Sequence, residues 1–179
     1  MESLIVQQPV ISTHTIPENR QFPNNPNLPV ILYKSAFSTE QPDLEKVIEE
    51  RFRENKWVDA WTDGIYEYHH YHSTAHEVLA VLNGNIALEL GGPNGLKFHL
   101  TAGDVIVLPA GVAHKNLENS KNFLCMGAYP KGQKYDLLYG KAGERPVADK
   151  NIQQVPLPER DPLFGEDGKL IQAWNNSSS

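Results

Sequence analysis

Cysteine is nearly absent from this 179-residue chain, and its scarcity excludes two structural devices. Cys125 is the only cysteine, so no disulfide can form within the chain and no zinc site can be built on several thiolates. A chain of this kind is typical of a reducing compartment. We therefore expect a cytoplasmic location.

Long apolar runs and an excess of positive charge are also missing. The longest mostly apolar stretch, residues 105–113, contains a proline and a glycine and is too short to span a bilayer. The first ten residues lack the lysine or arginine of a secretory signal. Sixteen basic and 22 acidic side chains give a net charge of −6, the wrong sign for a binder of phosphate backbones. We expect neither a membrane nor a nucleic acid as a partner.

The composition indicates one folded domain with an additional segment at each end. Hydrophobic residues make up 40% of the chain and charged residues 21%, as in globular proteins. Prolines gather in the two ends, where they disfavour regular structure. We predict an extended arm over residues 1–29, a central domain over 30–130, and an irregular C-terminal extension over 131–179 that packs on the domain. The last residues, 175–179, are predicted to be disordered.

Helical periodicity occurs once. Apolar residues recur at three- and four-residue steps in the segment 44–57, at Leu44, Val47, Ile48 and Phe52. Pro42 just before this segment fits a helix start. The pattern predicts one amphipathic helix over residues 44–57, on the N-terminal side of a β-barrel over residues 64–130.

After Gly64 the period changes to two. Short runs of alternating residues, beginning with residues 65–72, follow one another with turn residues between them, which is typical of an antiparallel sandwich or barrel. Asn83 and Gly84 predict a two-residue hairpin turn. In residues 77–82 both alternating sets are apolar, so we expect the arm, the helix or a second subunit to cover the outer face.

Histidine is concentrated in the same region. Residues two apart on a strand share a face, so His70 and His72 can converge on one ion, about 7 Å apart along the strand. Glu77 follows a short polar turn, and His114 follows a bend after a buried strand, so both can reach the same pocket. Three imidazoles and one carboxylate suit one divalent Fe, Mn, Co, Ni or Zn better than Ca or Mg. The alternative is a set of ordinary hydrogen-bonded side chains around a pocket.

Two tyrosines belong to the same predicted face. Tyr66 and Tyr68 share the parity of His70 and His72, so we expect them to line the same interior. There they either pack in the core or position a substrate.

The spacing of these residues resembles that of the cupins. The first cupin motif is glycine, five residues, His-x-His, three or four residues, glutamate, six residues and glycine. Its specified positions in this chain are Gly64, His70, His72, Glu77 and Gly84.

The second motif also matches, except at its last position. Glycine, five residues, Pro-x-Gly, two residues and histidine are present, and a glutamate stands where asparagine is usual. The positions are Gly103, Pro109, Gly111, His114 and Glu118. Phrases along nearly the whole chain, such as residues 71–77, 113–117 and 127–130, resemble the YjlB-like group of single-domain microbial cupins.

This resemblance implies an all-β fold, the double-stranded β-helix or jelly roll. It also implies that His70, His72, Glu77 and His114 would bind one divalent transition metal inside it. The leading hypothesis is a metalloenzyme on a small organic substrate, with dioxygenase-like oxidation as its chemistry. Glu77, Tyr66 and Tyr68 are then the candidate catalytic residues.

Two other hypotheses remain at this point, a redox-neutral metal-dependent isomerase or lyase and a cupin that binds a small molecule without converting it. We also expect a homodimer.

Overall fold

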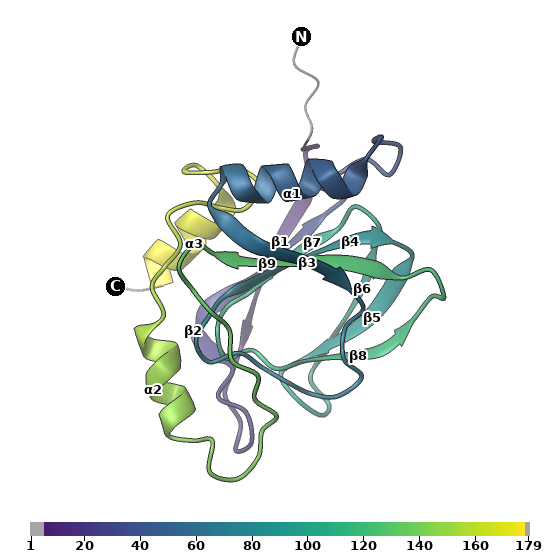
Figure 1. Cartoon of the computed structure of the whole chain (residues 1–179). Coiled ribbons are helices and arrows are strands. Elements are labelled where there is room, and N and C mark those ends of the chain that lie inside the picture. Colours follow the sequence, from purple (N-terminus) through teal and green to yellow (C-terminus); the bar gives the residue numbers. More distant parts are fainter. Residues whose placement is uncertain (1–5, 178–179) are drawn as a thin grey trace.

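The computed structural model describes residues 6–177, which form two antiparallel sheets with helices outside them (Figure 1). The larger sheet has the strand order β1-β2-β7-β4-β9-β3, and the smaller has the order β6-β5-β8. The strands are β1 (Val10–Ile16), β2 (Asn25–Lys34), β3 (Trp57–Asp63), β4 (Glu77–Asn83), β5 (Asn85–Leu90), β6 (Leu96–Thr101), β7 (Val105–Leu108), β8 (His114–Asn119) and β9 (Leu124–Pro130). The predicted mainly β, two-sheet architecture is confirmed.

The interior lies between the two sheets. Leu79 and Val81 of β4 pack there with aliphatic residues of the smaller sheet, among them Ile86, Leu88 and Leu100. All five side chains are buried. The predicted alternation of β4 therefore places one set of its apolar residues in the barrel interior.

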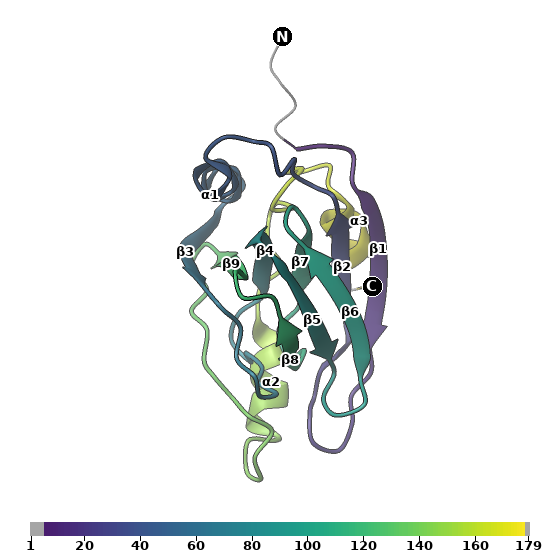
Figure 2. The same cartoon turned by 90° about the vertical axis from the view of Figure 1, so that its right-hand side faces the viewer.

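The other set of β4 residues faces outward and is covered by helices. Val78, Ala80 and Leu82 belong to a second core that contains Ile48 of α1 (Leu44–Glu54) and Trp174 of α3 (Lys169–Ser177). In Figure 2, α1 lies near β3 and α3 lies beside β1 and β2. The arm, the helix and a second subunit were the three candidates for covering this face. The structure shows that the helix α1 covers part of it.

The predicted helix is correct in its start but not in its end or in its place among the strands. It begins at Leu44 and buries Ile48 and Phe52. It ends at Glu54, because Lys56 has a positive φ of 62° and Trp57 starts β3. The helix also follows β1 and β2, so it is not N-terminal to the whole sheet.

The Asn83-Gly84 turn is a corner between sheets. β4 pairs with β7 and β9, whereas β5 pairs with β6 and β8. Gly84, at φ 72°, passes the chain from one sheet to the other. The predicted hairpin is therefore wrong, since the turn residues are present but the two strands do not pair with each other.

The N-terminal segment contains more regular structure than an arm. Residues 6–29, predicted only as extended, include all of β1 and the first part of β2, which pair with each other. Residues 1–5 lie outside the described part of the chain.

The C-terminal extension is only partly irregular, since two helices interrupt its turns and loops. It contains α2 (Val147–Gln154) and α3, and Nε1 of Trp174 in α3 donates to the carbonyl of Pro29 at 2.8 Å. Because α3 runs to Ser177, the predicted disorder is wrong for residues 175–177, and residues 178–179 lie outside the described part. No helix in residues 6–177 combines the length and apolar character needed to cross a membrane.

The segment before His70 forms no regular strand. Residues 64–69 make no ladder, and only His70 and Tyr71 form isolated bridges, to His114 and Leu138. The sequence alternates with period two there, but its contacts with the neighbouring strand β8 are sporadic: besides the bridge at His70, the backbone nitrogen of Asn116 donates to the carbonyl of Tyr66 at 3.0 Å. The predicted strand over residues 65–72 is therefore wrong, and β3 takes the position at the edge of the larger sheet.

Candidate metal centre

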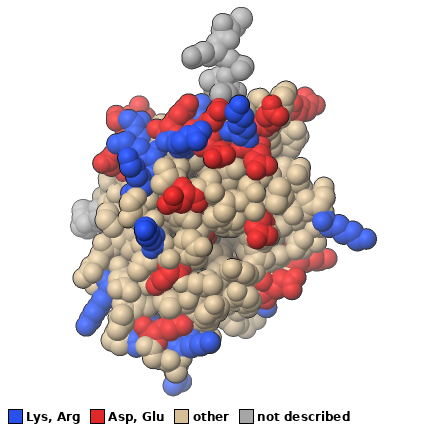
Figure 3. All heavy atoms as spheres, viewed as in Figure 1, with Lys and Arg blue, Asp and Glu red and all other residues tan. Residues whose placement is uncertain are grey.

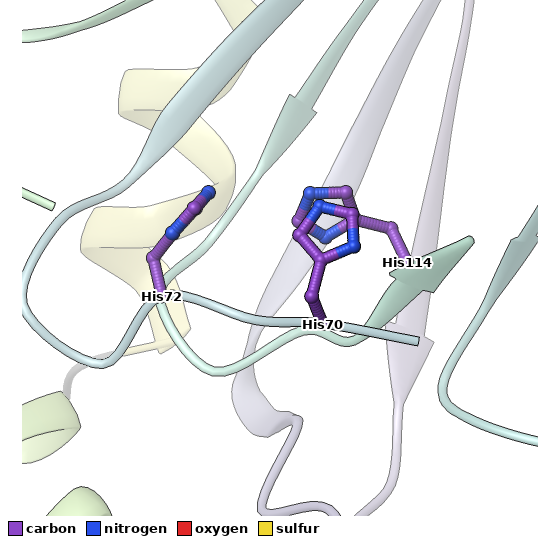
Figure 4. Close-up of side chains that lie close together, drawn as sticks. All are labelled: His70, His72 and His114. Carbon is purple, nitrogen blue, oxygen red and sulfur yellow. The ribbon is translucent and has the colours of Figure 1, made fainter. Parts of the chain in front are cut away.

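Three of the predicted ligands meet in the structure. One ring nitrogen of each of His70, His72 and His114 lies within 4.8 Å of the others, and all three residues are buried (Figure 4). The backbones of His70 and His114 exchange hydrogen bonds, with N···O distances of 3.2 and 2.9 Å. This bridge joins two segments more than 40 residues apart in the sequence and brings the two rings to 4.1 Å between centroids.

Hydrogen bonds to the backbone determine the tautomer of each histidine. Nδ1 of His70 lies 2.9 Å from the carbonyl oxygen of Tyr68, and Nδ1 of His114 lies 3.0 Å from that of Val112. Nδ1 of His72 lies 2.5 Å from the carbonyl oxygen of Asp136. A carbonyl can only accept, so each Nδ1 carries the hydrogen and each neutral ring keeps a bare lone pair on Nε2. Such an arrangement is typical of metal-binding histidines.

Glu77 adjoins the cluster from the first position of β4. Its carboxylate oxygens lie 3.4 Å from Nε2 of His114 and 3.6 Å from Nε2 of His72. These distances are longer than strong charge-assisted hydrogen bonds. Glu77 is only 3% exposed. The structure thus places a buried carboxylate beside nitrogen lone pairs, an arrangement that a cation stabilises.

The pKa values show the same need for positive charge. Burial acts to raise the pKa of Glu77, but the neighbouring imidazoles of His72 and His114 hold it below its usual value. Burial also disfavours a charged His72, yet nearby Glu77 raises the pKa of that imidazole above its usual value. Burial, with the neighbouring His114, lowers the pKa of His70 to about 3. The residues therefore fit a cation, whether a proton or a metal ion.

A second set of residues supports His72. The carboxylate of Asp136 accepts two hydrogen bonds from Ser73, one from the backbone nitrogen at 2.6 Å and one from the serine hydroxyl. The same residue's carbonyl binds His72. Asp136 was not among the predicted site residues. It lies more than 60 positions from His72 in the sequence, so no local pattern indicates this contact.

Another missed residue, Tyr129, lies beside Glu77. Its hydroxyl accepts a hydrogen bond from Nε1 of Trp61 at 2.7 Å and lies close enough to Glu77 for the two groups to interact. Burial and the charge of Glu77 raise the pKa of Tyr129, so this hydroxyl keeps its proton. The only available signal was its position in a predicted strand, which does not distinguish it from a core tyrosine.

The two predicted tyrosines lie in different places. Tyr66 lines the cavity above the histidines, and its ring centroid is 5.1 Å from that of His70. Tyr68 stacks on Tyr66 but lines a separate surface hollow with His69. The expectation that both line the interior is therefore wrong for Tyr68, because the parity argument needs a regular strand.

The glutamate of the second motif is not part of the cavity. Glu118 is exposed on β8, whereas Asn116 is buried and its Nδ2 donates to the carbonyl of Ile65 at 3.3 Å. Asn116 thus anchors the irregular segment that leads to His70.

The cavity at the open end of the barrel has a volume of about 430 Å³. Its walls combine the histidines and Glu77 with large aromatic and aliphatic side chains, including Trp61, Tyr66, Leu79, Tyr129, Tyr135 and Leu137. Figure 3 shows a hollow near the middle of the corresponding face, with an acidic side chain beside it. A pocket of this size and composition is suited to a small organic molecule.

Comparisons with known proteins agree with the motifs. The cupin domain model matches residues 60–124. The uncharacterized protein YjlB of Bacillus subtilis strain 168 is 36% identical over 162 residues, which cover 90% of this chain and 95% of that protein.

Solved structures are similar only at a distance. Acireductone dioxygenase from Bacillus anthracis, with a cadmium ion in its active centre, has a TM-score of 0.44 at 14% identity, over 62% of this chain and 83% of that one. RmlC from Streptococcus suis in complex with dTDP-D-xylose has a TM-score of 0.36 at 14% identity, over 76% and 74%. These similarities are too low to carry a functional argument. The 36% identity to YjlB, by contrast, extends over nearly the full length of both chains and is high enough to show the family. The chain therefore belongs to the YjlB-like group of the cupin superfamily.

Proposed function

We propose that this protein is a mononuclear metalloenzyme that acts on a small organic molecule, with oxygen-dependent oxidation as its reaction. His70, His72, His114 and Glu77 would hold one divalent ion of Fe, Mn, Co, Ni or Zn. The observation that carries the proposal is the fixed tautomer of all three histidines, because it leaves three lone pairs beside a buried carboxylate. Ordinary structural histidines would use these nitrogens in hydrogen bonds.

The bound ion would supply Lewis acidity and, in the case of iron, electrons for dioxygen. The protein's part is to hold and shield the reactants. Nε1 of Trp61 donates to the hydroxyl of Tyr129, which holds this hydroxyl beside Glu77. Because the hydroxyl of Tyr129 keeps its proton next to the cavity, it can donate a hydrogen bond to an oxygen atom of the substrate.

Substrate contact is expected at the mouth of the cavity. Tyr66 lines it, and Tyr68 supports Tyr66 by stacking at 4.9 Å between ring centroids. Leu79 and Leu137 line the same cavity with apolar surface. Together they would exclude water from the reacting end of the substrate.

Elemental analysis of the purified protein tests the metal site. We expect about one transition-metal ion per chain in the unaltered protein and almost none in the variant His72→Ala, because removal of one ligand leaves an incomplete set. His99→Ala is a matched control, since His99 is exposed on β6. Equal metal content in all three proteins would contradict the proposal.

Oxygen uptake tests the reaction. The Fe(II)-loaded protein is mixed with a panel of diols, thiols and keto acids, and we expect uptake with at least one of them and none with the His72→Ala variant. Turnover that is indifferent to oxygen would instead indicate an isomerase or lyase. Tight binding without conversion would indicate a small-molecule binding protein.

A further inference from the structure

One wall of the cavity is formed by Tyr66, which stacks on Tyr68. Tyr66 and Tyr68 lie 4.9 Å apart between ring centroids, with 17° between their planes. Tyr66 is 52% exposed although it adjoins the buried ring of His70. An aromatic ring that is held in place by a neighbour and still half-exposed offers a flat apolar surface to a ligand.

A second stacked pair adjoins the next histidine. The ring centroids of Tyr129 and Tyr135 lie 4.8 Å apart, with 22° between their planes. Tyr129 is buried, Tyr135 is 52% exposed, and the ring of Tyr135 lies 5.1 Å from that of His72. The exposed member of each pair therefore borders the cavity directly above one of the clustered histidines.

The charges of the cavity select against strongly anionic ligands. Apart from the histidines, the charged side chains among its described lining residues are Asp63 and Glu77, and both are acidic. A divalent cation would exceed the charge of Glu77 by one, and Asp63 at the mouth offsets that excess. A phosphorylated ligand would find no lysine or arginine in this lining to neutralise it.

We propose that the ligand of this site is a small planar aromatic compound that carries oxygen donors and no phosphate. Its ring would lie against the exposed faces of Tyr66 and Tyr135, and its oxygen atoms would point toward the histidine cluster. The proposal rests on the proposed function, because the oxygen atoms are expected to bind the metal ion. A single ring with its substituents fits a cavity of about 430 Å³.

Calorimetric titration tests the aromatic walls separately from the metal. The Zn(II)-loaded protein, in which no redox reaction occurs, is titrated with catechol, with acetohydroxamate as a chelator without a ring, and with glucose 6-phosphate. We expect catechol binding to weaken about three- to tenfold in Tyr66→Ala and in Tyr135→Ala, the range for loss of one aromatic contact. Acetohydroxamate binding should stay unchanged, and glucose 6-phosphate should bind more weakly than catechol.

Tyr139→Ala is the matched control, because Tyr139 is 38% exposed but does not line this cavity. Zinc content is measured for every variant. Catechol binding that is unaffected by both substitutions, or tighter binding of glucose 6-phosphate, would overturn the inference while the metal site stands. If no zinc binds at all, the proposed function fails, and catechol titration of the metal-free variants still decides whether the tyrosines form the binding walls.

Discussion

The two faces of the six-stranded sheet are both apolar, but different structures cover them. The outer face is sealed by α1 and α3, and two of its large side chains are also held by buried hydrogen bonds: Trp174 donates to Pro29, and the hydroxyl of Tyr33 donates to the carboxylate of Asp161. The inner face packs on the smaller sheet at one end and opens onto the histidines at the other. The difference teaches that folding stability and ligand binding are divided between opposite faces of one sheet.

A single strand contributes to both. In β4, Val78 and Ala80 face the helices, whereas Leu79 faces the interior together with Glu77. If the division is real, substitutions on one face should leave the property of the other nearly unchanged.

The largest effect is expected on the outer face. Trp174 is 1% exposed and packs in the outer core, so Trp174→Ala should lower the free energy of unfolding by about 3–5 kcal/mol. Metal content per folded chain should stay the same. Urea denaturation and elemental analysis measure the two properties, with Phe164→Ala as a half-exposed control expected to cost less. A loss of metal without a loss of stability would contradict the division.

A smaller effect, on metal affinity, is expected when the residue that supports His72 on the inner face is replaced. The variant Asp136→Ala removes the carboxylate that binds both the backbone nitrogen and the hydroxyl of Ser73, next to His72. Metal affinity should fall about 10- to 100-fold, the range for residues that orient a metal ligand. Competition with a chromogenic chelator measures it, and Asp167→Ala, at an exposed aspartate, is the control. Because the variant keeps the carbonyl that binds His72, unchanged affinity would show that His72 is oriented without the Asp136 carboxylate.

The smallest effect concerns the C-terminal extension, where Glu144 accepts hydrogen bonds from the backbone nitrogens of Tyr139 and Gly140 and from the hydroxyl of Tyr71. Partial burial acts to raise the pKa of Glu144, but these bonds hold it below its usual value. The carboxylate therefore stabilises the fold above the pKa of an unfolded glutamate, and this stability is lost as the pH falls through the lower folded value.

Glu144→Gln should consequently destabilise the protein by less than about 1 kcal/mol near neutral pH, since the group is partly exposed. The difference from the unaltered protein should shrink as the pH falls below the pKa of an unfolded glutamate and vanish below the lower folded value. Urea denaturation over a series of acidic pH values checks the sign, and a difference that grows on acidification would refute the assignment.

Features that depend on neighbours in the sequence were predicted well. The start of α1 at Leu44 follows from the apolar spacing within its own turns. The alternation of β4 correctly indicated that both of its faces are covered. The spacing of His70 and His72 likewise predicted that they would meet, and the structure brings both to His114.

Features that depend on a distant partner were not predictable in the same way. Asn83 and Gly84 have the residues of a hairpin turn, but whether the flanking strands pair with each other is decided by β7, β8 and β9. Tyr68 has the parity of the histidines, but the chain bends at residues 67–68 and forms no regular strand there, so the parity does not fix the direction of its side chain. The helices of the C-terminal extension form where Trp174 and Leu170 find an apolar face to cover.

The sequence by itself determined the chemistry of this protein's candidate site: its donor atoms, and the two motifs that hold them. Only the tertiary structure decided which nitrogen of each histidine is bare, which tyrosines border the cavity, and which residues hold Glu77 and His72 in place. The physical reason is that donor identity is a property of the residue, whereas a tautomer and an orientation depend on the folded backbone around it. The carbonyls of Tyr68 and Val112 bind His70 and His114 from two residues away, and folding brings the carbonyl that binds His72 from more than 60 positions away.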